Sequence, residues 1–87
     1  MDRNLVRLQE ECAEVIHIVS KIHRFGLDNW NPEISHRVKN YELLAKELGD
    51  LVGVISMITK NKKYKVTQND LEIQARRKIE KIKEWNR

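Results

Sequence analysis

The sequence has little of three residue types: it contains one cysteine, one proline and three glycines among 87 residues. The single thiol, Cys12, excludes an internal disulfide and a CxxC metal site. Scarce glycine and proline exclude collagen-like and low-complexity chains. No run approaches the roughly 18 apolar residues of a membrane span, and charges near the start argue against a signal peptide. We therefore expect a soluble, cytoplasmic protein without a membrane partner.

Helix-forming residues dominate what is present. Apolar residues make up 40% of the chain and charged residues 34%, with many Leu, Ile, Glu and Lys. This composition predicts an all-α fold, with residues 1–87 as a single domain of about three helices. So short a chain has a small core, and no disulfide can compensate. We therefore expect a homo-oligomer, either a dimer or a tetramer, that completes a four-helix or larger bundle.

Three segments repeat apolar residues at steps of three and four, which predicts helices. The predicted helices cover about residues 2–25, residues 37–59 and residues 69–85. Cys12 lies in the first apolar row and is expected to be a small buried side chain. The rows are Leu5, Leu8, Cys12, Val15, Val19 and Ile22, then Leu44, Leu48, Leu51, Ile55 and Ile58, then Leu71, Ala75, Ile79, Ile82 and Trp85.

Local signals predict the helix ends. Gly26 is expected to stop the first helix, and Pro32 or Ser35 to open the second. Asn69 and Glu72 have the spacing of a capping box and predict the start of the third helix. A basic connector over residues 60–65 precedes it.

Two glycines, Gly49 and Gly53, lie inside the second predicted helix. Each costs about 1 kcal/mol relative to alanine in a helix interior. Their presence four residues apart predicts the close approach of a neighbouring helix or of a ligand to this backbone.

Four acidic residues fall on helix faces that should be buried. Glu11 and Glu14 lie beside the first apolar row, and Glu47 and Asp50 interrupt a row of the second helix. Buried carboxylates without a partner cost several kcal/mol or become protonated, so they require a counter-charge. Each pair is one turn apart, about 5–6 Å at Cβ. Converging oxygens favour a hard divalent cation such as Mg²⁺, shared with substrate phosphates, over lysine or arginine.

The same residues carry a family resemblance. Glu10-Glu11-Cys12-Ala13-Glu14 followed by Glu47-Leu48-Gly49-Asp50 resembles the EExxE and ExxD signature of MazG-like proteins in the all-α nucleoside triphosphate pyrophosphohydrolase superfamily. The resemblance implies Mg²⁺-dependent hydrolysis of a (deoxy)nucleoside triphosphate to its monophosphate and pyrophosphate, with Mn²⁺ as a possible substitute. It also implies a bundle built from more than one chain.

By motif position, the resemblance implies that Glu11, Glu14, Glu47 and Asp50 are metal ligands. Glu10 is then an additional ligand or an outer contact. The expected mechanism is in-line attack of an activated water that expels pyrophosphate, and it requires no nucleophilic side chain.

Cations must offset these acids before a triphosphate can bind. The candidates are Lys21 and Arg24 near the end of the first helix and Lys78 and Lys81 on the third. Trp30 is a candidate platform for stacking on the nucleobase. The other interpretation of Trp30 is packing on its own helices or on a partner chain.

The net charge of +4 leaves other functions open. Residues 1–59 hold seven Lys/Arg and nine Asp/Glu, a balance of −2, whereas residues 60–87 hold ten and four, a balance of +6. One alternative is therefore a small helical dimer that binds nucleic acid through its basic C-terminal helix. Long helices and long connectors fit a helix-turn-helix poorly, so a nucleic-acid partner is not expected.

A second alternative is an adaptor without activity. The preferred base and sugar cannot be inferred from the sequence.

Overall fold

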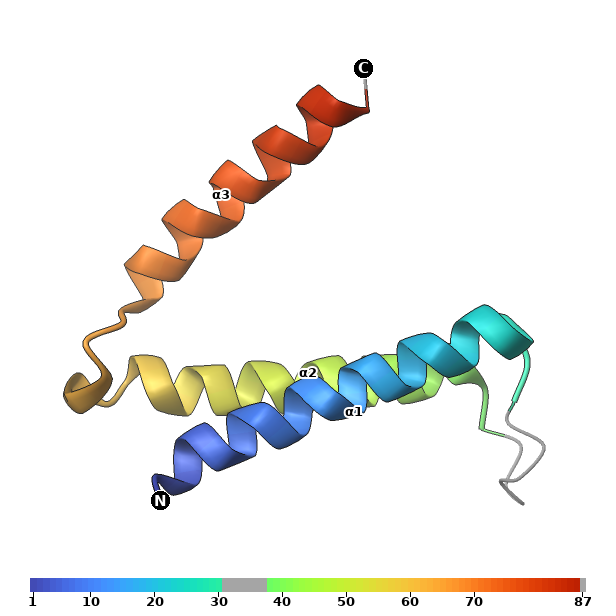
Figure 1. The fold of residues 1–87 in the computed structure, drawn as a ribbon, viewed down its shortest axis with the longest axis horizontal. Coiled ribbons are helices and arrows are strands. Elements are labelled where there is room, and N and C mark those ends of the chain that lie inside the picture. The colour runs from blue at the N-terminus through green and yellow to red at the C-terminus, as the bar shows by residue number, and fades with distance from the viewer. Residues whose placement is uncertain (31–37, 87) are drawn as a thin grey trace. The chain divides into compact units, whose positions relative to one another are not determined.

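The computed structural model of the chain describes residues 1–30 and 38–86 (Figure 1). The helices are α1 (Arg3–Phe25), α2 (Asn40–Thr59) and α3 (Gln68–Trp85), with a short 3-10 helix, η1 (Lys62–Tyr64), before α3. The described residues contain no strand, only an isolated antiparallel bridge between Trp30 and Lys39. The predicted all-α class is confirmed.

The chain divides into two compact units, Met1–Ile55 and Ser56–Arg87. The first unit contains α1 and most of α2, and the second contains the end of α2, η1 and α3.

Both ends of α1 are capped. The carboxylate of Asp2 accepts hydrogen bonds from the backbone N–H groups of Asn4 and Leu5, at 2.9 and 3.2 Å. These bonds satisfy two of the amides that a helix start leaves free. At the other end Gly26 has a φ of +90°, and its N–H donates to the carbonyl of Ile22 at 2.7 Å. Positive φ favours glycine, so the predicted stop at Gly26 is confirmed.

Hydrogen bonds of Asn40 connect the start of α2 to the end of α1 and the segment after it. Its side chain is fully buried, and its Nδ2 donates to the carbonyl of Gly26 at 2.9 Å. Its backbone N–H donates to the carbonyl of Asn29 at 2.8 Å. The bridge from Trp30 to Lys39 keeps Lys39 outside the helix. For this reason α2 begins at Asn40, and residues 38 and 39, which were predicted to be helical, lie outside it.

The start predicted at Pro32 or Ser35, like residue 37, lies outside the described residues.

The two helices of the first unit lie side by side and antiparallel, as Figure 1 shows and as the bond from Asn40 to Gly26 requires. Ile18 of α1 and Val54 of α2 are buried, with 5% and 9% of their surface exposed. Half-buried apolar residues extend this small core: Leu8, Val15, Ile22 and Phe25 on α1, and Leu43, Leu44, Leu51 and Ile55 on α2.

The prediction that Cys12 is buried is wrong, because its thiol-bearing side chain is exposed. The face of α1 that packs is centred on Val15 and Ile18. It shares Val15 with the predicted row but is rotated about the helix axis, so that Ile18 takes part in the packing and Cys12 does not. Leu5 and Val19, which share the predicted row with Cys12, are also exposed. Glu11 belongs to the packed face and is half-buried.

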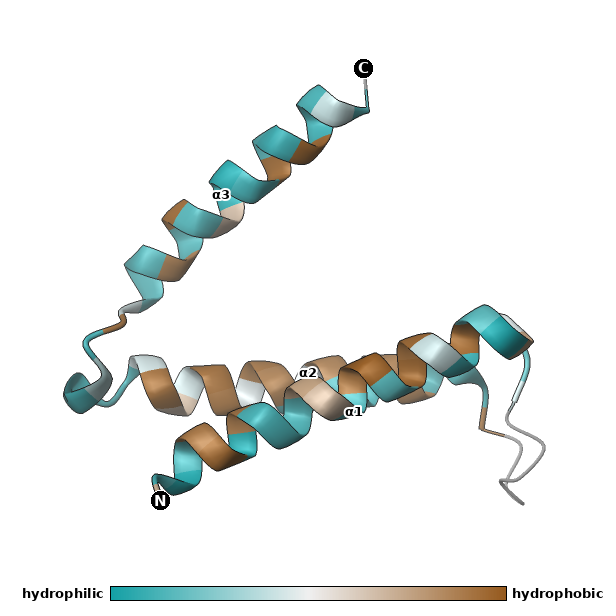
Figure 2. Ribbon diagram, viewed as in Figure 1, coloured by the Kyte–Doolittle hydropathy of each residue, from teal (hydrophilic) through white to brown (hydrophobic). Residues whose placement is uncertain are grey.

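Hydrophobic residues continue around α2 onto the face that α1 does not cover (Figure 2). Tyr41, Leu48 and Val52 are exposed there, Val52 with 63% of its surface. Gly49 and Gly53 lie near this row, and a Cβ built on either would meet nothing within 4 Å. Within the described residues, no neighbouring helix therefore packs closely on these glycines, and a close approach by a ligand or a partner chain stays a prediction.

In the second unit, α3 starts earlier than predicted. The capping box is formed by Thr67 and Asp70, not by Asn69 and Glu72. The Thr67 hydroxyl accepts from the N–H of Asp70 at 3.1 Å, and the Asp70 carboxylate accepts from the N–H of Thr67 at 2.9 Å. Thr67 and Asp70 have the same three-residue spacing as the predicted pair, so spacing alone did not distinguish the two.

We expect Thr67→Ala to destabilise α3 by about 0.5–2 kcal/mol, the usual cost of losing an N-cap. Hydrogen bonds from the Thr67 backbone, and then from its side chain, hold the pKa of Asp70 below its ordinary value. Because this pKa is lowered, the stabilisation is present above the ordinary pKa and is lost as the pH falls through the lowered one. Circular dichroism during a urea titration measures the destabilisation caused by Thr67→Ala. Asn69→Ala is the control, and an equal destabilisation in that variant would contradict the assigned cap.

Candidate metal centre

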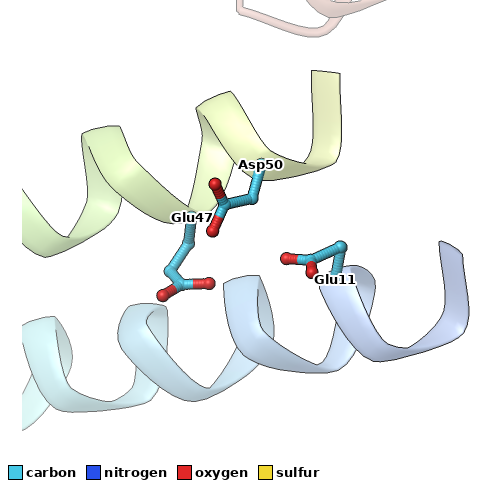
Figure 3. A group of neighbouring side chains, drawn as sticks. All are labelled: Glu11, Glu47 and Asp50. Carbon is cyan, nitrogen blue, oxygen red and sulfur yellow. The ribbon is translucent and has the colours of Figure 1, made fainter. Parts of the chain in front are cut away.

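Three carboxylates from two helices meet at one point. Glu47 and Asp50 project from α2 toward α1, and Glu11 projects from α1 into the same space (Figure 3). One oxygen from each of the three side chains lies within 4.8 Å of the other two. Glu11 and Glu47 are half-buried, and Asp50 is exposed. This group is called the carboxylate cluster below.

Helix geometry explains how these side chains converge. Glu47 and Asp50 are three residues apart, so they lie one turn apart on the same side of α2. Glu11 lies on the face of α1 that also carries Val15 and Ile18 and packs on α2. The antiparallel packing of the two helices therefore brings the first acidic motif opposite the second.

The electrostatics of the carboxylate cluster show the repulsion that such convergence creates. The pKa of Glu11 is raised, first because packing removes water from its carboxyl group. The negative charges of Asp50 and Glu47 raise it further, and Glu14 adds a smaller contribution in the same direction. A cation at this point would relieve the repulsion.

Lys46 supplies a positive charge at the edge of the carboxylate cluster. Its Nζ lies 2.9 Å from Oδ2 of Asp50 and 3.3 Å from Oε1 of Glu47. Hydrogen bonds to Asp50 and Glu47 raise the pKa of Lys46, so the ammonium form is favoured. The same ammonium acts on Glu11 in the direction opposite to the acids and lowers its pKa.

A hollow of about 180 Å³ adjoins the carboxylate cluster. It lies between α1 and α2 and is lined by Glu14, His17, Ile18, Lys21, Leu43 and Glu47. Glu47 therefore belongs both to the cluster and to the hollow. Two of the predicted residues, Glu14 and Lys21, line the hollow although neither belongs to the cluster.

Three other predicted residues of the first unit are not brought to the cluster or the hollow. Glu10 is exposed on α1. The guanidinium carbon of Arg24 lies 5.1 Å from the centre of the Phe25 ring. Trp30 is 41% exposed and pairs with Lys39 through the isolated bridge. The roles predicted for Glu10, Arg24 and Trp30 stay predictions.

The two predicted lysines of the second unit, Lys78 and Lys81, lie one turn apart on α3 and are exposed. Nζ of Lys78 lies 5.1 Å from the centre of the Trp85 ring, within cation–π range. Both lysines line an open surface hollow formed by α3 alone. Their predicted phosphate contacts stay predictions.

Sequence reasoning missed two residues of this region. Lys46 precedes Glu47 directly and lies four residues before Asp50, a spacing at which a helical ion pair forms, so the signal was present. His17 lies three residues after Glu14 and four before Lys21, which places the three on one face of α1. The helical spacing of His17 from Glu14 and Lys21 would have shown that it lies beside them.

The donor set of the carboxylate cluster fits a hard divalent cation. All three donors are carboxylate oxygens, the ligand type that Mg²⁺ and Mn²⁺ prefer. Three protein ligands would leave positions for water and for substrate phosphate on an octahedral ion. A divalent ion would also offset the negative charges of Asp50 and Glu47 that act on Glu11.

The fold and the carboxylate cluster together define an all-α protein that gathers carboxylates from two antiparallel helices. The chain belongs to the MazG nucleotide pyrophosphohydrolase domain family, whose family model matches residues 1–85. The resemblance inferred from the two acidic motifs is thereby confirmed. No curated protein and no solved structure matches the chain significantly. Among the described residues, no helix has both the length and the apolarity needed to cross a bilayer.

Proposed function

We propose that the chain is a Mg²⁺-dependent hydrolase that converts a (deoxy)nucleoside triphosphate to its monophosphate and pyrophosphate. Membership of the MazG family supports the class of activity. The observation that carries the metal dependence is the carboxylate cluster, in which oxygens of Glu11, Glu47 and Asp50 lie within 4.8 Å of one another. Mn²⁺ is expected to substitute, because it accepts the same oxygen ligands.

The carboxylate cluster would hold the metal ion, and Glu14 is the proposed further ligand because it shares the hollow with Glu47. When bound, Mg²⁺ neutralises phosphate oxygens and makes a bound water acidic enough to act as nucleophile. Attack of water on the α-phosphorus would form one P–O bond and break the bond from that phosphorus to the oxygen that bridges to the β-phosphorus. The β- and γ-phosphates would leave together as pyrophosphate, and the proton of the water would pass to solvent. Lys21 lines the same hollow and would offset the negative charge of the phosphates.

The hollow is small for a complete nucleotide. Its volume of about 180 Å³ is below the roughly 300 Å³ at which pockets for organic ligands begin. We therefore assign it to the phosphates and place the nucleobase outside it. Arg24, Trp30, Lys78 and Lys81 remain candidates for binding the rest of the substrate, and Glu10 remains a candidate for an additional metal ligand or an outer contact.

We further propose that a second copy of the chain covers the outward face of α2. The row of Tyr41, Leu48 and Val52 is apolar and exposed, and it carries no charge that would oppose pairing with the same row of another copy. Gly49 and Gly53 leave room beside it for a close backbone approach. A two-fold axis would set each row against itself. The small core of the first unit supports self-association as a source of stability.

The proposed activity is tested by incubating the purified protein with a panel of ribo- and deoxyribonucleoside triphosphates and Mg²⁺. We expect equal amounts of monophosphate and pyrophosphate from at least one substrate, and loss of turnover in excess EDTA. Chromatography of the nucleotides separates this outcome from release of diphosphate and orthophosphate. Diphosphate as the product, or turnover that persists in EDTA, would contradict the proposal.

A further inference from the structure

Lys46 occupies the position of a cation in the carboxylate cluster. Its ammonium contacts Asp50 at 2.9 Å and Glu47 at 3.3 Å, so it contacts two of the three side chains assigned to the metal. Carboxylates this close repel one another. Lys46 reduces the repulsion and allows the three side chains to converge before any metal arrives.

A divalent ion and Lys46 would compete for the carboxylates of Glu47 and Asp50. Mg²⁺ binds carboxylate oxygens at about 2.0–2.1 Å, so an ion held by these two side chains would use the negative charge that now stabilises the ammonium of Lys46. The two cations would also repel each other at such a separation. Metal binding therefore favours the movement of Lys46 away from Glu47 and Asp50.

Lys46 is free to make this movement. Its side chain is 63% exposed, so little packing holds it in place. A lysine ammonium sits on a flexible four-carbon stem and can redirect its bonds with little strain. Because Lys46 directly precedes Glu47, the released ammonium stays next to a metal ligand and therefore close to phosphates bound to that metal.

We propose that Lys46 is a built-in counter-ion of the carboxylate cluster, which the divalent metal displaces and which then pairs with a substrate phosphate. This inference rests on the proposed metal site. It makes Lys46 a positioning residue with two measurable effects. Lys46 weakens metal binding in the absence of nucleotide, and it strengthens nucleotide binding once the metal is present.

The test is Mn²⁺ binding to the full chain, measured by electron paramagnetic resonance without nucleotide, for the unaltered protein and for Lys46→Gln. We expect Lys46→Gln to bind Mn²⁺ about three- to tenfold more tightly, the range expected when two partly exposed ion pairs no longer compete. With Mg²⁺ saturating, the KM for the nucleotide should rise by a similar factor while kcat changes little. Lys46→Arg should restore both values toward those of the unaltered protein.

Lys60→Gln is the matched control. It removes the same charge one residue beyond the end of α2, about 15 Å along the helix axis from Asp50, which exceeds the screening length in 0.15 M salt. Unchanged Mn²⁺ affinity or unchanged KM in Lys46→Gln would overturn the inference. If the unaltered chain binds no Mn²⁺ and hydrolyses no triphosphate, the proposed function itself fails, so the two failures are distinguishable.

Discussion

Replacing Glu47 with glutamine is expected to reduce pyrophosphate release at least about 100-fold. Glu47 is the residue that the carboxylate cluster and the hollow share, so the variant removes a charge from both the metal and the phosphate region. Changes to groups that only orient a metal ligand already cost about 10–100-fold in activity or metal affinity, and loss of a ligand should exceed this. The measurement is the rate of pyrophosphate release at saturating Mg²⁺ and nucleotide, with Mn²⁺ affinity measured on the same sample.

The control for this experiment is Glu72→Gln on α3, which removes one exposed carboxylate that lies outside the cluster. Its activity should equal that of the unaltered chain. Because Glu47 is one of several acids that repel each other, Glu47→Gln should fold at least as well as the original, and circular dichroism checks this. Retention of turnover by a folded Glu47→Gln protein would remove Glu47 from the site.

The second large effect is expected from Val52→Glu on the outward face of α2. In a two-fold interface each copy contributes the substituted residue, so two unpaired charges would enter one apolar contact. We expect the dissociation constant of the oligomer to rise at least about 100-fold, equivalent to roughly 3 kcal/mol. Light scattering after size-exclusion chromatography would then show a monomer at concentrations where the unaltered chain is a dimer or tetramer.

Gln68→Glu provides the same change of charge at the exposed first residue of α3 and should leave the mass unchanged. An oligomer that survives Val52→Glu would show that this face is not the interface. A monomeric unaltered chain would contradict the proposed homo-oligomer altogether.

The helices could be predicted because local signals for them are strong. Apolar spacing and the glycine at position 26 gave the extent of α1 to within one residue. The start of α3 was missed by one residue, and its capping pair by two, because two overlapping pairs share the same spacing. Residues 38 and 39 were wrongly included in the second helix, because the start of α2 depends on the pairing of Lys39 with Trp30, which no local pattern in the second helix reveals.

Helical periodicity could predict which acids are neighbours on one helix, but not which acids of the two helices meet. Glu47 and Asp50 are close on one helix, but the inclusion of Glu11 and not Glu14 in the carboxylate cluster depends on how α1 is rotated against α2. The packed face of α1 is rotated about the helix axis relative to the predicted row, because Cys12 of that row is exposed. Both positions contain enough apolar side chains to pack, so periodicity alone could not choose between them.

The attachment of Asn40 to Gly26 has a consequence for how this hairpin can vary. This hydrogen bond joins the end of α1 to the start of α2. The register of the two helices therefore depends on this bond and on the bridge from Trp30 to Lys39, and not on the length of chain between Trp30 and Lys39. Relatives could therefore lengthen or shorten that connection without sliding the second acidic motif along the first. A change in the length of that connection would therefore leave the spacing of the acids across the two helices unchanged.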